Sequence, residues 1–199
     1  AWVLYAEGKY DEAIRRVRLA IERKPDVEGG YYLLGRALFA AGKYQEVADV
    51  AESPVAAAGE DYNIYVPIHN AFGALGKKDA LRYVVLQRIQ VLEAHLKKFP
   101  EDARGRTLLA TDYAHVERVD DAFRDANLAM ALRPNDAMVM YNVACVFGQL
   151  GRKLEALEAL RKAKDAGWKD ATWARRDPDL AILHGDPDFD ALYPPGAGE

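Results

Sequence analysis

The residues that could carry out chemistry are few, and their spacing forms no known catalytic or metal-binding pattern. The histidines show neither a His-x3-His pair nor a His-Glu-x2-His motif, and they are His69, His95, His115 and His184. The single cysteine, Cys145, is a lone small residue of the kind that usually serves packing rather than nucleophilic attack. No Gly-x-Gly-x2-Gly or phosphate-binding loop is present. We therefore predict that the chain is not an enzyme and has no cofactor and no metal site.

A group of acidic residues near the C-terminus is the other candidate for chemistry. It consists of Asp170, Asp177, Asp179, Asp186, Asp188 and Asp190. The spacing of a calcium-binding loop and its distal glutamate are missing, so helix capping is the favoured interpretation over a metal site. Asp177-Pro178 and Asp186-Pro187 each pair an N-cap aspartate with a proline at the first helical position. They predict two short helices in a segment that caps the fold.

The elements that must position these residues repeat along the chain at a fixed period. Similar turns at Gly8, Gly42 and Gly76 are 34 residues apart. The next equivalent turn is centred on Glu117, 41 residues later, and Gly151 follows it by 34. A second marker agrees, because prolines 100 and 134 are also 34 residues apart. The chain is therefore predicted to be a repeat of one helical hairpin, with seven residues inserted in the third unit.

The repeated segments resemble the tetratricopeptide repeat, whose pattern is Trp-x2-Leu-Gly-x2-Tyr, then Ala-x3-Phe, then Pro. The matching residues are Tyr31, Leu34, Gly35 and Leu38 in the second unit, Leu109, Ala110, Tyr113, Ala122, Ala126 and Pro134 in the fourth, and Val143, Ala144, Phe147, Ala156 and Leu160 in the fifth. The first unit keeps Ala13, Val17 and Pro25. The ending also resembles the tails of bacterial arrays, which often follow an adenylate cyclase, a serine/threonine kinase or a transcription-regulatory domain.

This resemblance implies an all-α fold, an α-solenoid of stacked antiparallel helix hairpins with a C-terminal cap. Small residues are needed where two helices cross closely, and no hairpin can bury its apolar face alone. We expect a single domain over residues 1–199. Its units are expected at about 1–27 (partial), 28–61, 62–102, 103–136 and 137–170, followed by a cap at 171–193 and a tail at 194–199.

The middle of the chain departs from the pattern. Ser53-Pro54 should break the second helix of unit two, and Pro67 with His69 should loosen or kink unit three. The second helix of unit three is predicted to run from about Lys78 to Lys98. The insertion is about two helical turns, so the apolar face stays in phase. That face either packs on unit four, which we favour, or forms an exposed binding or dimer face; it consists of Val85, Ile89, Leu92, Leu96 and Phe99.

The resemblance implies a protein-interaction module that binds a peptide or protein segment in a concave groove lined by first helices. The register places these residues in the groove: Tyr32, Arg36, Phe39, Asn63, Val66, Asn70, Thr107, Thr111, His115, Met138, Tyr141, Cys145 and Gln149. Aromatic and amide side chains suit an extended peptide. Tyr32, Phe39 and Tyr141 have an equally weighted alternative, which is to fill gaps between helices. The alternative function is a regulatory C-terminal arm that packs on a parent cyclase or kinase and mediates its assembly.

Composition limits the partners. The chain is 50% hydrophobic and 29% charged with a formal net charge of -4, so a nucleic-acid partner is not expected. No apolar run approaches the roughly 20 residues that cross a membrane, so membrane insertion is not expected either. A single cysteine permits a reducing compartment, and we expect the cytoplasm, with the periplasm as the alternative. The chain begins within an apolar stripe and lacks an initiator methionine, which suggests a piece of a longer protein. The incomplete first unit and the helix near 78–98 are candidate homodimer surfaces.

Overall fold

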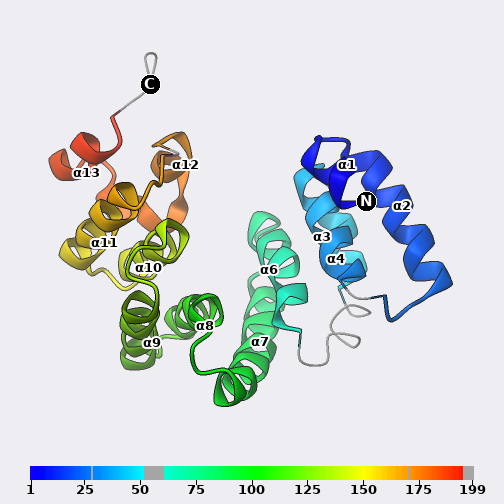
Figure 1. Cartoon of the computed structure of the whole chain (residues 1–199), viewed down its shortest axis with the longest axis horizontal. Coiled ribbons are helices and arrows are strands. Elements are labelled where there is room, and N and C mark those ends of the chain that lie inside the picture. The colour runs from blue at the N-terminus through cyan, green and yellow to red at the C-terminus, as the bar shows by residue number, and fades with distance from the viewer. Residues whose placement is uncertain (28, 52–60, 170, 195–199) are drawn as a thin grey trace. The chain divides into compact units, whose positions relative to one another are not determined.

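The structure, a computed structural model, describes residues 1–27, 29–51, 61–169 and 171–194, with the backbone alone at 172, 173, 176 and 178. All regular elements in these residues are helices, which confirms the prediction of an all-α fold (Figure 1). The chain divides into two compact units, Ala1–Val91 and Leu92–Glu199. We call them unit 1 and unit 2; each is larger than the repeat units of the sequence analysis and contains more than one of them. Helix α7 crosses the boundary between them.

Unit 1 contains the first three helix pairs of the repeat. Its elements are α1 Trp2–Ala6, α2 Tyr10–Arg23, α3 Gly30–Ala40, α4 Tyr44–Asp49, the 3-10 turn η1 Tyr62–Ile64, α6 Tyr65–Ala74 and the first part of α7 Lys78–Lys98. Its core includes Leu34, Leu38 and Ile68, which are buried in one hydrophobic cluster. Gly35 lies where α3 approaches Pro67 of α6, and a Cβ there would come within 2.6 Å of the proline ring. The small residue that the repeat pattern requires is therefore explained by this close approach.

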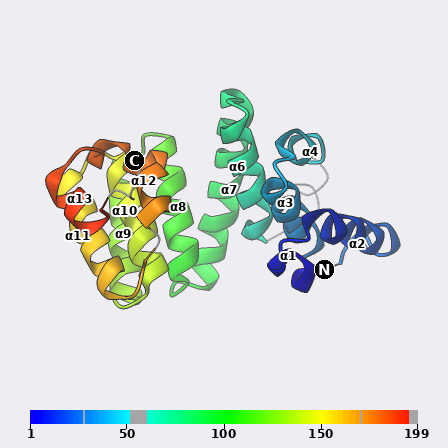
Figure 2. The same cartoon turned by 90° about the horizontal axis from the view of Figure 1, so that it is seen from above.

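Unit 2 contains two helix pairs and the C-terminal cap. Its complete elements are α8 Ala103–His115, α9 Val119–Leu132, α10 Ala137–Gln149, α11 Lys153–Asp165, α12 Ala171–Arg176, the 3-10 turn η2 Pro178–Leu183 and α13 Pro187–Leu192. Helices α8 to α11 pack side by side (Figure 2), with fully buried Ala110 and Ala144 on the first helices and Ala122 and Ala156 on the second. The small residues let the helix axes approach closely, as the repeat pattern predicts.

The turns between paired helices share one backbone conformation. Gly8, Gly42, Gly76 and Gly151 have φ values of 74°, 73°, 65° and 72°. Glu117 has φ of 62° and is the residue at the fourth turn, where the register predicted an equivalent without glycine. A left-handed conformation is strained for a residue with a Cβ, so the position of the turn is imposed by the helices on either side.

Aspartate side chains begin several of the helices in unit 2. Asp102 accepts a hydrogen bond from the amide of Gly105, and Asp136 accepts from Met138 and Val139. These contacts satisfy amides that have no partner within the helix. The predicted cap aspartates do the same, because Asp177 accepts from Asp179 N, and Asp186 from the amides of residues 188 and 189. Both predicted short helices are present, although the first is a 3-10 turn, and α12 was not predicted.

The irregular middle of the chain follows the predictions in part. Helix α7 begins at Lys78 and ends at Lys98, as expected. Helix α6 runs through Pro67, which lies in its first turn, where proline is tolerated. The predicted break at Ser53-Pro54 lies outside the described residues. On α7, the apolar face is buried at four of its five positions, Val85, Ile89, Leu92 and Leu96, and Phe99 is 48% exposed. Packing was therefore the better interpretation for these four residues.

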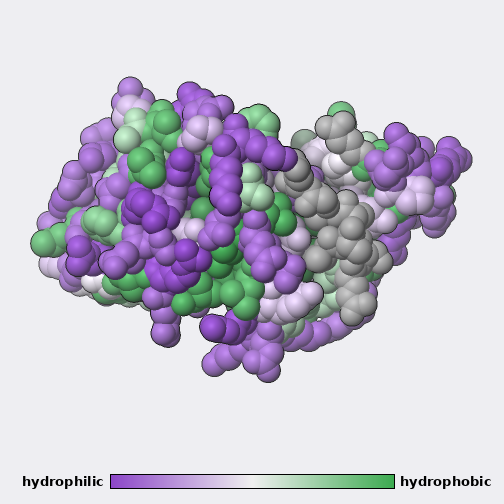
Figure 3. Space-filling view, turned by 90° about the horizontal axis from the view of Figure 1, so that it is seen from below, coloured by the Kyte–Doolittle hydropathy of each residue, from purple (hydrophilic) through white to green (hydrophobic). Residues whose placement is uncertain are grey.

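The surface is mixed in character. One face of the molecule, in Figure 3, shows hydrophilic side chains with hydrophobic ones scattered between them. On the short helix α1, Trp2 is 48% and Val3 is 69% exposed. Among the described helices, none is both long and apolar enough to cross a membrane.

Candidate functional site: the first-helix faces

The most distinctive polar site in unit 1 is an arginine held between two tyrosines. Arg36 on α3 donates from Nη1 to the hydroxyl of Tyr32 at 3.1 Å and from Nη2 to the hydroxyl of Tyr5 at 3.0 Å. Its guanidinium carbon lies 5.1 Å from the ring centre of Tyr5 and 5.6 Å from that of Tyr32. The indole of Trp2 contacts both tyrosine rings at 6.0 Å. Arg36 is nevertheless exposed, so a fixed cation faces the solvent.

The Arg36 guanidinium is positively charged and keeps hydrogen-bond donors that the two tyrosines do not use. Burial works against the charged form of Arg36, but hydrogen bonds to Tyr32 and Tyr5 outweigh it and raise the pKa of the guanidinium. A guanidinium has five N–H donors, of which the two tyrosines take two. The remaining donors can bind a carboxylate in a planar, two-point contact. We call the group formed by Trp2, Tyr5, Tyr32 and Arg36 the arginine site.

Most of the other groove residues predicted in unit 1 are less accessible to a ligand. Phe39 is half-buried with its ring 4.9 Å from that of Tyr44. Asn63 is half-buried and donates from its side chain to Asp61 at 2.9 Å. Asn70 on α6 is exposed, and Val66 is half-buried. The arginine site and Asn70 are thus the accessible polar groups among them.

In unit 2, the predicted threonines are directed at their own helix. The hydroxyl of Thr107 donates to the carbonyl of Arg104 at 2.8 Å, and that of Thr111 donates to the carbonyl of Thr107 at 2.9 Å. Thr107 is 1% exposed and Thr111 is half-buried. His115, by contrast, is exposed at the end of α8, as is Met138 at the start of α10.

The predicted groove residues of α10 are covered by the C-terminal cap. Tyr141, 2% exposed, donates its hydroxyl to Asp177 Oδ2 at 2.7 Å. The Cys145 thiol lies 3.6 Å from the same oxygen. Segment η2 packs along α10 (Figure 1), and a Cβ at Gly148 would lie 2.2 Å from the carbonyl oxygen of Asp179. Gln149 is half-buried at the end of the same helix.

The contact between α10 and the cap also contains a cluster of possible metal ligands. Ligand atoms of Cys145, Asp177 and Asp179 lie within 4.8 Å of one another. Burial, and then the nearby Asp177, raise the pKa of the Cys145 thiol well above its usual value, which keeps the proton on sulfur. Burial, and then the Asp177 charge, raise the pKa of Asp179 to about 6, while a contact with Gln149 opposes the shift. The oxygens of Asp177 already accept from Tyr141 and from the Asp179 amide. Hydrogen bonding accounts for this arrangement, so we assign no metal to it.

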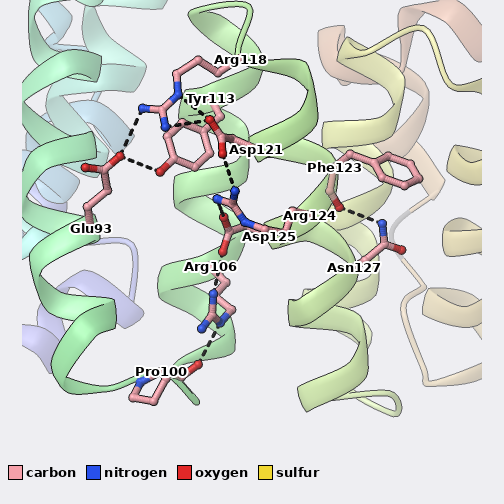
Figure 4. A network of polar contacts seen from close by, with 10 residues as sticks. All are labelled: Glu93, Pro100, Arg106, Tyr113, Arg118, Asp121, Phe123, Arg124, Asp125 and Asn127. Atoms are coloured by element: carbon pink, nitrogen blue, oxygen red, sulfur yellow. Dashed lines mark hydrogen bonds and ion pairs between the residues drawn. The ribbon is translucent and has the colours of Figure 1, made fainter.

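A charged network that the sequence did not indicate joins α7, α8 and α9 (Figure 4). Asp125, whose side chain is 3% exposed, accepts from Arg106 at 2.6 Å and from Arg124 at 2.7 Å. At the other end, Arg118 pairs with Glu93 at 3.2 Å. Glu93 also accepts from the hydroxyl of Tyr113 at 2.7 Å, and burial followed by this contact raises the pKa of the tyrosine. The network fixes the end of the long helix to the next hairpin.

Comparisons with known proteins bear on this fold. The family model described as tetratricopeptide repeat matches residues 139–166, which form α10, α11 and the turn between them. A solved structure of TTC0263, a thermophilic TPR protein of Thermus thermophilus, aligns with 91% of this chain and 94% of its own, with a TM-score of 0.66 and 23% identity. The fold is that of the tetratricopeptide-repeat solenoids. In the terms of that family, α3, α6, α8 and α10 are first helices, and the sites above lie on their faces.

Two further relatives extend the comparison. YrrB, described as a TPR protein with an unusual peptide-binding site, aligns with 92% of this chain and 86% of its own, at a TM-score of 0.53 and 19% identity. A chloroplastic protein of Arabidopsis thaliana is 42% identical over 60 residues. That match spans 30% of this chain and 18% of the relative, less than a fifth of its length. The resemblance of the cap to arrays behind cyclases or kinases stays a prediction.

Register alone missed three residues that complete these sites. Trp2 and Tyr5 lie on the short helix α1, and the register assigned them no groove role, but the hydroxyl of Tyr5 accepts a hydrogen bond from Arg36 on α3. Asp177 was identified as a helix cap and performs that role, but it also bonds Tyr141. The available signal for Tyr5 was its place three residues before the first turn glycine, which is the place of Phe39, a predicted groove residue, before Gly42.

Proposed function

We propose that this chain is a protein-interaction module that binds an extended acidic segment of a partner protein on the first-helix face of unit 1, with Arg36 as the anchor. The observation that carries the proposal is the exposed guanidinium fixed by Tyr5 and Tyr32 at 3.0 and 3.1 Å. A cation held in place before binding loses little conformational freedom when a carboxylate arrives. YrrB, with its peptide-binding site, supports a peptide ligand for the fold.

The surroundings of Arg36 supply the rest of the contact. The indole of Trp2 and the tyrosine rings offer rigid apolar area beside the charge, which is the composition of interface hot spots. Asn70, which is exposed on α6, remains a candidate contact for a longer ligand. Tyr141 and Thr107 are buried, so this proposal gives them a supporting role in packing.

The test uses an array of 12-residue peptides in pairs, one with a central Asp-Glu and the other with Asn-Gln in its place. Kd values are then measured by fluorescence anisotropy for the wild type and for Arg36→Ala. We expect acidic peptides to bind more tightly than their amide partners, and Arg36→Ala to weaken them about 30-fold, which corresponds to about 2 kcal/mol.

A matched control removes a comparable charge elsewhere. Arg16 on α2 is exposed and lies 3.9 Å from Glu12 in a surface ion pair, so Arg16→Ala lowers the net charge equally without touching the arginine site. We expect it to change the Kd less than twofold. Equal weakening by both substitutions would show that only overall charge matters. Binding that ignores both would remove Arg36 as the anchor.

A further inference from the structure

The face of α10 that is covered by the cap is the same face that is open on α3. Tyr141 and Cys145 stand three residues before and one residue after Ala144, as Tyr32 and Arg36 stand around Gly35. In unit 1 these positions form the exposed arginine site. In unit 2 Tyr141 and Cys145 contact Asp177 of the same chain, and Gly148 on the same helix lies against Asp179 and Leu180. The covering segment therefore lies where a ligand of this fold is expected to lie.

The contacts have the form of peptide recognition. A carboxylate of the segment accepts from a tyrosine hydroxyl at 2.7 Å, and the backbone of Asp179 passes over Gly148 so closely that no side chain would fit between them. Leu180 and Leu183 are fully buried and anchor the segment through apolar contact. Polar orientation combined with buried anchors is how peptides are held in protein grooves.

Some contacts between residues 177–180 and their site on α10 are unfavourable, so another peptide can replace this segment. The carboxylates of Asp177 and Asp179 lie within 4.8 Å of each other where the segment contacts α10. Burial and the Asp177 charge raise the pKa of Asp179 to about 6, so at neutral pH this carboxylate is charged at an energetic cost. The indole Nε1 of Trp168 and the hydroxyl of Tyr193 are buried there without a hydrogen-bond partner in the described part of the chain. These costs lower the affinity of the segment for its own site.

We propose that residues 177–180 are an intramolecular ligand, and that the face of α10 is a second peptide site that binds an acidic Asp-Pro-Asp-Leu segment of another protein once its own segment leaves. The site selects an aspartate for Tyr141 and a leucine for the apolar anchor position. A partner gains access only by competing with the cap, so its apparent affinity is reduced by the fraction of chains that are closed. This inference does not depend on the arginine site.

Cys145 reports the state of this site, because it is the single cysteine of the chain and is 6% exposed under Asp177. The full-length Leu180→Ala variant removes the buried anchor of the segment and leaves α10 unchanged. We expect the rate of alkylation of Cys145 by iodoacetamide to rise at least 10-fold. A synthetic peptide of residues 175–185 should then slow it towards the wild-type rate. A control peptide with Asp177 and Asp179 changed to asparagine and Leu180 to alanine should not protect.

Gly148→Ala is the matched variant for the site itself. Its Cβ collides with the Asp179 carbonyl, so it should expose Cys145 as well, but the same methyl group should prevent protection by the added peptide. The proposal is overturned if the wild-type peptide at 1 mM fails to protect the Leu180→Ala variant, if the control peptide protects equally, or if neither substitution speeds alkylation.

A measurement on the wild type covers the case in which the variants unfold. Hydrogen exchange of residues 177–183 is followed with and without 1 mM peptide. Replacement of the segment by the peptide should speed exchange of these residues at least threefold, while the amides of α10 stay protected. Unchanged exchange of residues 177–183 would show a permanent structural cap and overturn the proposal.

Discussion

Helices α3 and α10 carry a tyrosine at the same place in the repeat, and the two tyrosines do opposite things. Tyr32 accepts a hydrogen bond from an exposed cation, Arg36, and its helix face stays open to solvent. Tyr141 donates to a carboxylate of the cap, Asp177, and is 2% exposed. Equivalent positions in a repeat therefore do not imply equivalent roles. The two faces differ in the residue four positions after the tyrosine, which is Arg36 on α3 and Cys145 on α10. They also differ in whether another part of the chain covers them.

The largest expected effect is a difference between Tyr141 and Tyr32 in how much free energy of unfolding is lost when each is replaced by alanine. Tyr141→Ala removes a buried ring stacked on Trp168 at 4.1 Å and leaves Asp177 without its donor, so unit 2 should lose about 3–5 kcal/mol. Tyr32→Ala removes a half-buried ring and should cost about 1 kcal/mol. Urea denaturation with hydrogen exchange resolved by helix measures both. Similar losses in the two variants would mean that the faces are equally buried.

The second prediction uses pH to loosen one face and not the other. The Asp179 carboxyl has a pKa raised from 3.8 to about 6 in the docked cap, so the docked form binds the proton more tightly than the released form. Docking is therefore strongest below about pH 4 with respect to this group, weakens as pH rises through 6, and changes little above 7. Exchange rates of residues 177–183, corrected for intrinsic rates, should show this trend, and Asp179→Asn should flatten it. A trend that persists in Asp179→Asn would assign the effect to another group.

The third prediction asks whether the open face needs the shape of the guanidinium or only its charge. Arg36→Lys keeps the charge but loses the planar pair of donors and the contact with two rings, so acidic peptides should bind about fivefold more weakly, an effect of about 1 kcal/mol. Stability should stay within about 0.5 kcal/mol of the wild type. Wild-type affinity in this variant would show that the site needs only a positive charge and not the planar guanidinium.

Much of the fold could be predicted because it follows from local periodicity. The 34-residue register located the turns, including one at Glu117 without a glycine, and the apolar spacing located the helix from 78 to 98. The caps at Asp177 and Asp186 were predicted because an aspartate before proline has a local reason to begin a helix. Each of these features depends on residues close together in the sequence.

The site could be predicted only in part, because it depends on contacts between distant segments. Register identified Tyr32 and Arg36, but it gave no reason for Tyr5 to approach from 31 residues away. It identified Tyr141 and Cys145 but not their cover, since a short 3-10 turn has no periodicity that states which surface it packs on. The helix α12 was missed because it is six residues long and carries no repeat marker.

The smallest expected effect concerns the turns, where the two units also differ. The described turns between paired helices of unit 1, at Gly8, Gly42 and Gly76, have glycine in the left-handed conformation, whereas unit 2 has Glu117 at φ of 62°. Glu117→Gly relieves that strain and should stabilise unit 2 by about 0.5–1 kcal/mol, because the gain in the folded state exceeds the added freedom of the unfolded chain. Gly151→Ala introduces the same strain at the other turn of unit 2 and should destabilise it by a similar amount. Opposite shifts of the urea midpoint would show that the register, and not the glutamate side chain, sets the backbone at residue 117.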